Sequence, residues 1–238
     1  IGTIPAVNLQ YSIGVGAYND IQDAQDLAGN SFNWVIPDSI NQIVKIKAIN
    51  SNAQKPTTSN PSGIFAIKGK LVLDNPGPVW DVGKQKNITW TRIGSIATAK
   101  LEYNYGTGFT YIKDTNGQDA VSVDASAQTF AWNIPNTIND NVVVRITNTL
   151  DSEVTDDTNP FKIAADINLT SPLGGQVWIV DEGRAITWTK AGTIDNVVIR
   201  YDTNEGLDNF PDINIIATRP AADGSYTWSI PDKIGTGL

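Results

Sequence analysis

Apolar and polar residues alternate with a period of two along most of this chain, and the alternating segments recur. FNWVIPDSINQIVKIKAIN (32–50) is followed by FAWNIPNTINDNVVVRITN (130–148) and by YTWSIPDKIGTGL (226–238). Alternation of this kind is typical of strands with one buried face. Helical periodicity is essentially absent. The sequence therefore predicts an all-β protein built from repeated units.

One alternating block follows a Gly-Ser/Thr-Ile turn and reads GTIPAVNLQY, GSIATAKLEY and GTIDNVVIRY in its three copies. Its apolar face carries Val7, Leu9 and Tyr11, then Ala99, Leu101 and Tyr103, then Val197, Ile199 and Tyr201. The opposite face is largely polar. This pattern predicts an antiparallel sheet with one face in the core and one in water.

Three further blocks predict more strands. An aromatic residue, Trp and Ile lie two apart at 32–36, 130–134 and 226–230, and a proline then ends each predicted strand because it cannot donate to a ladder. The next strand alternates through Val44, Ile46 and Ala48, or through Val142, Val144 and Ile146. A fourth block occurs only in the second and third copies, as GPVWDVGKQKNITW and GGQVWIVDEGRAITW. Its alternation predicts a strand on which Ile88 and Trp90, or Ile186 and Trp188, face inward.

Tryptophan spacing gives the length of the repeat. Trp34, Trp132 and Trp228 are separated by 98 and 96 residues, and all seven tryptophans occupy repeat positions. Short strands in units of about 100 residues predict tandem immunoglobulin-like β-sandwiches. Aromatic faces also stack on sugar rings, so a glycan-binding platform is the alternative to core packing; the inward strand positions favour the core.

The repeat predicts three units. Residues 1–69 form a partial unit that lacks its first strands, 70–165 a complete unit, and 166–238 a partial unit that lacks its last two strands unless a neighbouring molecule supplies them. The joins FAIKGKLVL and FKIAADINL contain no Gly/Ser-rich or Pro-rich spacer. We therefore expect a stiff string of units with limited bending.

Charge and composition exclude several classes of function and partner for this chain. The net charge is −8, from 25 acidic and 17 basic residues without a basic run, which argues against a nucleic acid or an anionic membrane as partner. No apolar run is long enough to insert this segment into a membrane. Cysteine and histidine are both absent, so thiolate zinc sites and Ser/His/Asp or Cys/His catalysis cannot be built within the chain. Carboxylate catalysis would need a cleft, and no unit has an insertion large enough for one, so we expect no enzyme.

Two acidic segments, expected to be loops, are candidate Ca²⁺ sites, because hard oxygen ligands suit this ion. DSEVTDDTN offers Asp151, Glu153, Asp156 and Asp157, and DTNEGLDNFPD offers Asp202, Glu205, Asp208 and Asp212. Neither keeps a defined calcium spacing, and the matching part of the first unit, SNAQKPTTSN, has no acid. A solvated polar loop is the alternative that we favour. Ca²⁺ is the one cofactor the sequence suggests.

Two Asn-x-Thr triplets are candidate glycosylation sites, at Asn87 and Asn168. Asn87 precedes an inward-facing isoleucine on a predicted strand, so its own side chain is expected to point outward.

The segment SPLGGQVWIVDEGRAITWTKAGTIDNVVIRYDTNEG, with GSYTWSIPD after it, resembles the Ig-like modules found in tandem in large bacterial cell-surface proteins of the surface-layer type. It is similar, too, to the N-terminal module of the yeast cell-wall glucan-assembly and Ser/Thr-rich glycolipid-anchored family. The matching residues are Pro172, Gly174, Gly175, Trp178, Gly183, Ile186, Trp188, Gly192, Ile194, Tyr201, Trp228 and Pro231. The resemblance recurs once per unit and supplies no catalytic residues.

That resemblance implies an extracellular protein at the cell surface. The leading hypothesis is a fragment of a surface-layer or cell-envelope protein whose partners are copies of itself, with cell-wall or surface glycans as further candidates. The alternative is an adhesin or a carbohydrate-binding stalk of a large secreted protein.

Overall fold

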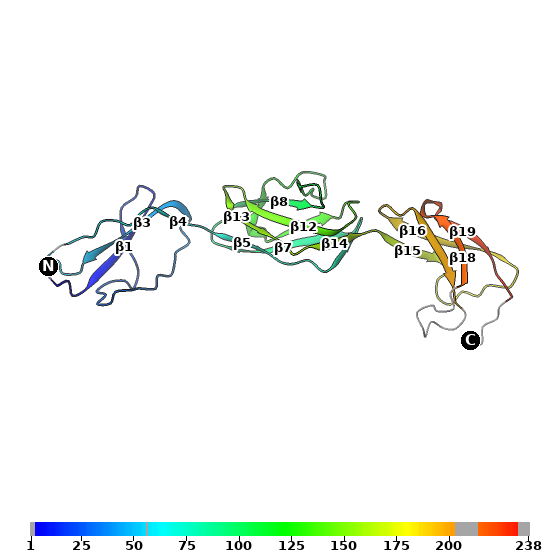
Figure 1. Cartoon of the computed structure of the whole chain (residues 1–238), viewed down its shortest axis with the longest axis horizontal. Coiled ribbons are helices and arrows are strands. Elements are labelled where there is room, and N and C mark those ends of the chain that lie inside the picture. Colours follow the sequence, from blue (N-terminus) through cyan, green and yellow to red (C-terminus); the bar gives the residue numbers. More distant parts are fainter. Residues whose placement is uncertain (1–2, 56, 203–213, 233–238) are drawn as a thin grey trace.

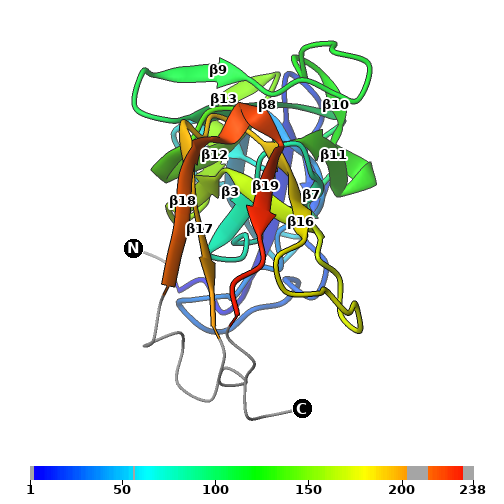
Figure 2. The ribbon, with the colours of Figure 1, turned by 90° about the vertical axis from the view of Figure 1, so that its right-hand side faces the viewer.

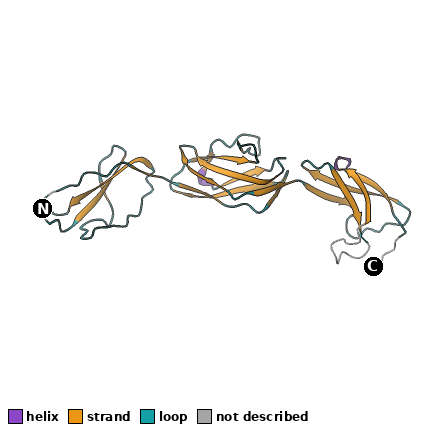
Figure 3. Ribbon diagram, in the orientation of Figure 1, coloured by secondary structure: helices purple, strands orange, loops and turns teal. Residues whose placement is uncertain are grey.

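The computed structural model describes residues 3–55, 57–202 and 214–232, and its strands form three groups along an elongated molecule (Figure 1). These described residues form strands and loops almost throughout, with two short 3₁₀ helices among them (Figure 3). The first group (β1–β4) is one sheet in the order β2-β1-β3-β4. Its strands are β1 (Val7–Ile13), β2 (Asn19–Asp20), β3 (Asn41–Asn50) and β4 (Phe65–Ile67).

The middle group (β5–β14) is a two-sheet sandwich. One sheet has the order β11-β7-β5, and the other runs β10-β8-β12-β14-β6, with β9 on β8 and β13 on β12. All pairs are antiparallel except β14 with β6, which is parallel. The elements are β5 (Lys70–Leu73), β6 (Val79–Asp81), β7 (Gln85–Ile93), β8 (Thr98–Asn104), β9 (Phe109–Tyr111), β10 (Val123–Asp124), η1 (Ala125–Ala127), β11 (Thr129–Asn133), β12 (Asn139–Asn148), β13 (Asp151–Asp157) and β14 (Phe161–Ala164).

Alternating side chains of the two middle sheets meet in one core. Leu101, Val142 and Ile146 each expose 0% of their surface, and Trp132 exposes 2%. The Trp132 ring lies 5.0 Å from the Tyr103 ring, in a tilted arrangement that aromatic pairs prefer. Burial of each large apolar side chain contributes about 1.5–3 kcal/mol, so this interface between sheets is the main source of stability.

The third group (β15–β19) has a three-stranded sheet, β15-β16-β19, and a two-stranded sheet, β17-β18. Its elements are β15 (Asp166–Ser171), β16 (Gly183–Ala191), β17 (Asn196–Tyr201), β18 (Asn214–Pro220), η2 (Ala221–Asp223) and β19 (Ser225–Ser229). Trp188 donates from Nε1 to the Ala221 carbonyl at 2.9 Å, as Trp90 does to the Ala125 carbonyl at 3.0 Å in the middle group. In the view down the long axis the third group lies in front of the other two (Figure 2).

Most predicted strands are confirmed, but one prediction is wrong. The aromatic-Trp-Ile block forms β11 and β19, whereas residues 31–37 form no strand. β11 pairs with β7 and β19 pairs with β16, and the described part of the first group has no counterpart of these partner strands. An alternating sequence forms a strand only where a neighbour accepts its backbone hydrogen bonds.

Candidate functional sites at the junctions between groups

The first junction joins the first and middle groups through a carboxylate. Asp38 follows Pro37 in a tight turn closed by the bond from Ser39 N to Pro37 O, at 2.8 Å. Its Oδ1 accepts the backbone N–H of Ser95 at 2.8 Å, and its Oδ2 accepts the Ser95 hydroxyl. The Asp38 side chain of the first group thus binds both the backbone N–H and the hydroxyl of Ser95, which lies in the Gly-Ser-Ile turn of the middle group.

These hydrogen bonds favour the ionised form of Asp38. The Ser95 hydroxyl, then the Ser95 N–H and the charge of Arg92 hold the pKa of Asp38 below its usual value of 3.8. Gly94, just before Ser95, has φ +81°, and a Cβ there would lie 3.2 Å from Asp38 Oδ1 and 3.3 Å from the Gly69 Cα. Glycine therefore permits both the turn and the close approach of the two groups.

Lys68 adds an ionic bridge on the short connection between β4 and β5. Its Nζ lies 3.0 Å from Asp151 Oδ2 and also pairs with Glu153. Gln42 of the first group donates to the same Asp151 oxygen at 3.1 Å. Hydrogen bonding from Lys68 lowers the pKa of Asp151, and the bonds to Glu153 and Asp151 raise that of Lys68.

The second junction repeats the first with an amide. Asn136 also lies in a turn after a proline, with Thr137 N donating to Pro135 O at 2.8 Å. Its Oδ1 accepts the Thr193 backbone N–H at 3.1 Å, and its Nδ2 donates to the Thr193 hydroxyl at 2.9 Å.

Glycine and an ion pair recur at the second junction as well. Gly192 has φ +87°, and a Cβ there would lie 3.2 Å from Asn136 Oδ1 and 3.3 Å from the Ala165 Cβ. Lys84 pairs with Asp166 at 3.2 Å across the junction. Asp38 to Ser95 and Asn136 to Thr193 both span 57 residues, so one geometry links successive groups twice.

These junction residues were not singled out from the sequence, although a signal was present. Asp38 and Asn136 fall at one position of the repeated Ile-Pro block, and Ser95 and Thr193 at one position of the Gly-Ser/Thr-Ile turn. Both motifs have obvious local roles, as a strand end and as a turn. The two motifs contact each other across the junction, and this long-range contact cannot be inferred from either motif alone.

The first acidic segment lies on strand β13, where a loop was expected, and its carboxylates have separate partners. Asp157 accepts two hydrogen bonds from Arg145, both 2.7 Å, in a bidentate pair. Asp156 accepts the Leu73 backbone N–H at 2.8 Å, which ties β13 to β5. Asp151 and Glu153 share Lys68. In the described ranges, no group of three or more His, Cys, Asp or Glu side chains could hold a metal ion.

The second acidic segment is described only at Asp202. Glu205, Asp208 and Asp212 lie outside the described residues, so the Ca²⁺ prediction for this segment remains a prediction.

Both glycosylation candidates are exposed and lie on strands. Asn87 is on β7, paired with Ala131, and Asn168 is on β15, paired with Thr189. The threonine of each triplet already has a hydroxyl partner: Thr89 donates to Asp74, and Thr170 bonds to Thr187. Glycosylation stays a prediction at both sites.

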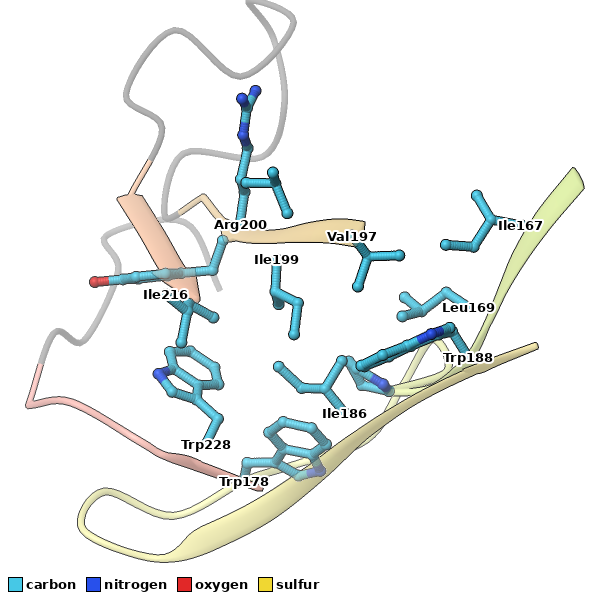
Figure 4. Close-up of a pocket in the computed structure, with 13 residues that line it drawn as sticks. Ile167, Leu169, Trp178, Ile186, Trp188, Val197, Ile199, Arg200, Ile216 and Trp228 are labelled. Carbon is cyan, nitrogen blue, oxygen red and sulfur yellow. The ribbon is translucent and has the colours of Figure 1, made fainter. Parts of the chain in front are cut away.

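The tryptophans differ in burial between groups. Trp80, Trp90, Trp132 and Trp188 expose 8% or less, whereas Trp34, Trp178 and Trp228 are half-buried. Trp178 and Trp228 line an apolar groove of about 530 Å³ in the third group (Figure 4). Full burial in a core therefore accounts for four of the seven, and Trp178 and Trp228 in the groove, like Trp34 in the first group, remain partly accessible.

The strand pairing defines the class of protein. Two facing sheets, with β8 beside β12 and the parallel pair of β14 with β6, make the middle group an immunoglobulin-like sandwich, and the chain is an all-β protein with Ig-like repeats. No helix among the described residues is long and apolar enough to cross a membrane.

No protein-family model matches the sequence, and no curated protein matches it. Among solved structures, the chain is similar to the fibronectin(III)-like modules of Clostridium thermocellum CbhA, with 18% identity over 67% of this chain and 78% of that one and a TM-score of 0.24. It is similar as well to a fragment of the ICAM-5 D1–D4 ectodomain, with 13% identity over 97% of this chain and 61% of that one and a TM-score of 0.28. Because both TM-scores are low, the fold assignment rests on the strand pairing.

Proposed function

We propose that this chain is a stiff structural segment of an extracellular surface-layer or cell-envelope protein, built from tandem Ig-like modules. The observation that carries the proposal is the junction made twice, by Asp38 with Ser95 and by Asn136 with Thr193. A surface assembly needs modules held at a fixed spacing, and a short connection with paired side chains fixes that spacing. The acidic composition and the resemblance to surface modules support the extracellular setting.

Small-angle X-ray scattering of the whole chain tests the stiffness. We expect a maximum dimension that matches three modules in a row, and a shorter average dimension for Asp38→Ala combined with Asn136→Ala. The matched control is Asp114→Ala combined with Asn116→Ala, in a turn of the middle group that makes no contact between groups. An unchanged scattering profile in the junction variant would show that these side chains do not stiffen the chain.

Assembly tests the surface role. We expect the purified chain to associate laterally into ordered arrays visible by electron microscopy under ionic conditions that favour lattices. The adhesin alternative is favoured by the half-buried Trp178 and Trp228, whose faces suit sugar rings. A chain that stays monomeric and binds members of a glycan array would support that alternative and contradict the structural one.

A further inference from the structure

The connection from β5 to β6 opens a notch in the side of the middle group, where every residue from 70 to 165 is described. β5 pairs with β7 over Lys70–Leu73, and one more bond follows, from Asp74 N to Thr89 O at 3.0 Å. The chain then crosses to the other sheet, where β6 pairs with β14. The space that β5 leaves beside β7 is a cavity of about 210 Å³, the notch, whose lining includes Asp74, Asn75, Trp80, Asn87, Ile88 and Val144.

Backbone groups of β7 point into this space. Trp90 N–H bonds toward β11, to the Gln128 carbonyl at 3.3 Å, whereas the Thr89 carbonyl bonds toward β5. Because the N–H and C=O groups of successive strand residues point to opposite sides, those of Asn87 point to the same side as those of Thr89. β5 no longer pairs with β7 at Asn87, so a backbone donor and a backbone acceptor face the notch.

Polar side chains around the notch have hydrogen-bonding capacity left. Asp74 Oδ2 accepts the Thr89 hydroxyl at 2.6 Å, and its Oδ1 accepts no hydrogen bond from the residues that the structure describes. The Asn87 amide likewise makes no side-chain hydrogen bond within the described ranges. Asp74 is the only charged residue in the lining, so the notch favours a neutral or positively charged ligand over an anion.

The floor of the notch is apolar and fixed. Trp80, Ile88 and Val144 expose 8%, 4% and 1% of their surface. The Trp80 ring packs on the Phe161 ring at 5.0 Å and on the Trp132 ring at 6.1 Å. These contacts hold the floor in place before a ligand arrives, which lowers the entropic cost of binding.

We propose that the notch binds one neutral or amino-substituted sugar ring of a surface glycan. The apolar C–H face of the ring packs on the floor beside Trp80, and its hydroxyl groups bond to Asp74 and to Asn87. Pockets for drug-sized ligands have about 300–1,000 Å³, so a cavity of about 210 Å³ suits a single ring. The site is complete within the middle group and does not depend on the proposed structural role.

The third group shows that the fold tolerates a change at Asn87. Ala185 of β16 occupies the same position, because each residue precedes the inward isoleucine of its strand and pairs with the same position of the next strand. Asn87→Ala therefore removes the polar side chain without an alteration that is foreign to the repeat. Asp74→Asn removes the charge and keeps the shape of the side chain.

Amide NMR titration of the whole chain, produced in a host that does not glycosylate Asn87, tests the proposal. The probes are glucose, galactose and mannose, followed by the amino sugar and the uronic acid of the hexose that binds best. We expect saturable shifts of the Gly77 and Asn87 amides at millimolar sugar. The amino sugar should bind about two- to fivefold more tightly than the hexose, and the uronic acid about two- to fivefold less tightly, because Asp74 attracts one charge and repels the other.

Two variants and a control separate ligand binding from a structural role. Asp74→Asn should bind the hexose more weakly and should hold all three forms of the sugar with similar affinity, which loss of the bond to Thr89 alone would not cause. Asn87→Ala should weaken all three forms alike and keep their order. Asp114→Asn removes the same charge from a turn outside the notch and should leave every affinity unchanged.

Several results would overturn the proposal. One is the absence of saturable shifts with any of the three hexoses, and another is equal affinity for the neutral, amino and acidic forms in the unaltered chain. Unchanged binding in Asn87→Ala and Asp74→Asn would also overturn it. Shifts confined to the surroundings of Trp178 and Trp228 would assign sugar binding to the third group instead. The amide spectra of the free variants outside the notch show that these variants are folded.

Discussion

At the scale of single residues, burial separates positions that are identical in sequence. Trp34 and Trp132 occupy the same place in the repeated block, but Trp132 exposes 2% of its surface and Trp34 is half-buried. Trp132 contacts Tyr103 and Trp80, whereas Trp34 packs on Tyr11 at 5.1 Å. The difference arises from the second sheet, which covers Trp132 and has no counterpart over Trp34 among the described residues.

Alanine substitution should reveal that difference. Trp132→Ala is expected to lower the stability of the middle group by about 3–5 kcal/mol, because it leaves a cavity in a closed core. Trp34→Ala should cost clearly less, since water already reaches part of the ring. Native-state hydrogen exchange of the amides in β12 and β3, respectively, measures the two losses separately. Equal losses would mean that burial does not set the contribution of this ring.

At the scale of elements, pairing decides whether an alternating sequence becomes a strand. Residues 31–37 and 129–133 carry the same apolar pattern, yet only the second forms a strand, because β7 accepts its hydrogen bonds. Alternation places the apolar side chains of a segment on one face, which can then be buried. A neighbouring strand then has to supply the backbone partners.

Hydrogen exchange should separate the two segments. No amide from 31 to 36 donates to a backbone carbonyl in the part of the chain that the structure describes, so these amides should exchange at close to unprotected rates. The amides of β11 that bond to β7 should be protected by orders of magnitude. Strong protection at 31–36 would indicate a partner strand that the described residues do not include.

The carboxylates of strand β13 form hydrogen bonds and ion pairs within the protein, which argues against the calcium site considered from the sequence. Asp156 and Asp157 bond to β5 and β12, and Asp151 bonds to Lys68. Because those oxygens already have partners at hydrogen-bond distance, a cation would have to displace them.

Removal of calcium should therefore leave this strand unaffected. We expect the melting temperature of the middle group to be the same in EDTA and in millimolar Ca²⁺. Asp156→Asn should lower it in both buffers, since the change weakens the bond to Leu73 N. A rise in melting temperature with Ca²⁺ that disappears in Asp156→Asn would instead establish β13 as a calcium site.

At the scale of the whole molecule, the two junctions differ in their response to pH. Asp38 has a pKa below 3.8 in the folded chain, so its contribution to the first junction is present above that value and is lost as pH falls through the lowered pKa. Asp151, whose pKa is lowered as well, acts in the same direction at the same junction. Asn136 does not titrate, so the carboxylate at the second junction is that of Asp166, which pairs with Lys84 at 3.2 Å.

Acidification from pH 6 through the lowered pKa of Asp38 should accordingly loosen the first junction more than the second. The chain has no cysteine, so pairs of spin labels can be introduced at single positions: Asn60→Cys with Ser122→Cys across the first junction, and Ser122→Cys with Asp223→Cys across the second. Electron–electron distance distributions should broaden more for the first pair than for the second, where the hydrogen bonds between Asn136 and Thr193 involve no titratable group.

The Asp38→Asn variant is the matched control for this prediction. It replaces the carboxylate by the amide found at the second junction, and combined with Asp151→Asn it should remove most of the pH dependence. Equal broadening at both junctions, or at neither, would contradict the assignment of the pH response to these carboxylates. Circular dichroism at the lowest pH used checks that the sandwiches themselves stay folded.

The sequence by itself determined most of the strands and the inward faces of Ile88, Trp90, Leu101 and Val144, because alternation and turn residues act over a few neighbouring positions. It also indicated the repeat and the short connections. Only the tertiary structure decided which repeat positions meet across a junction, which carboxylates have partners, and which tryptophans are covered. Those outcomes depend on residues that lie far apart along the chain, 57 positions apart at each junction, and on whether a second sheet lies opposite the first, and local pattern carries no information about either.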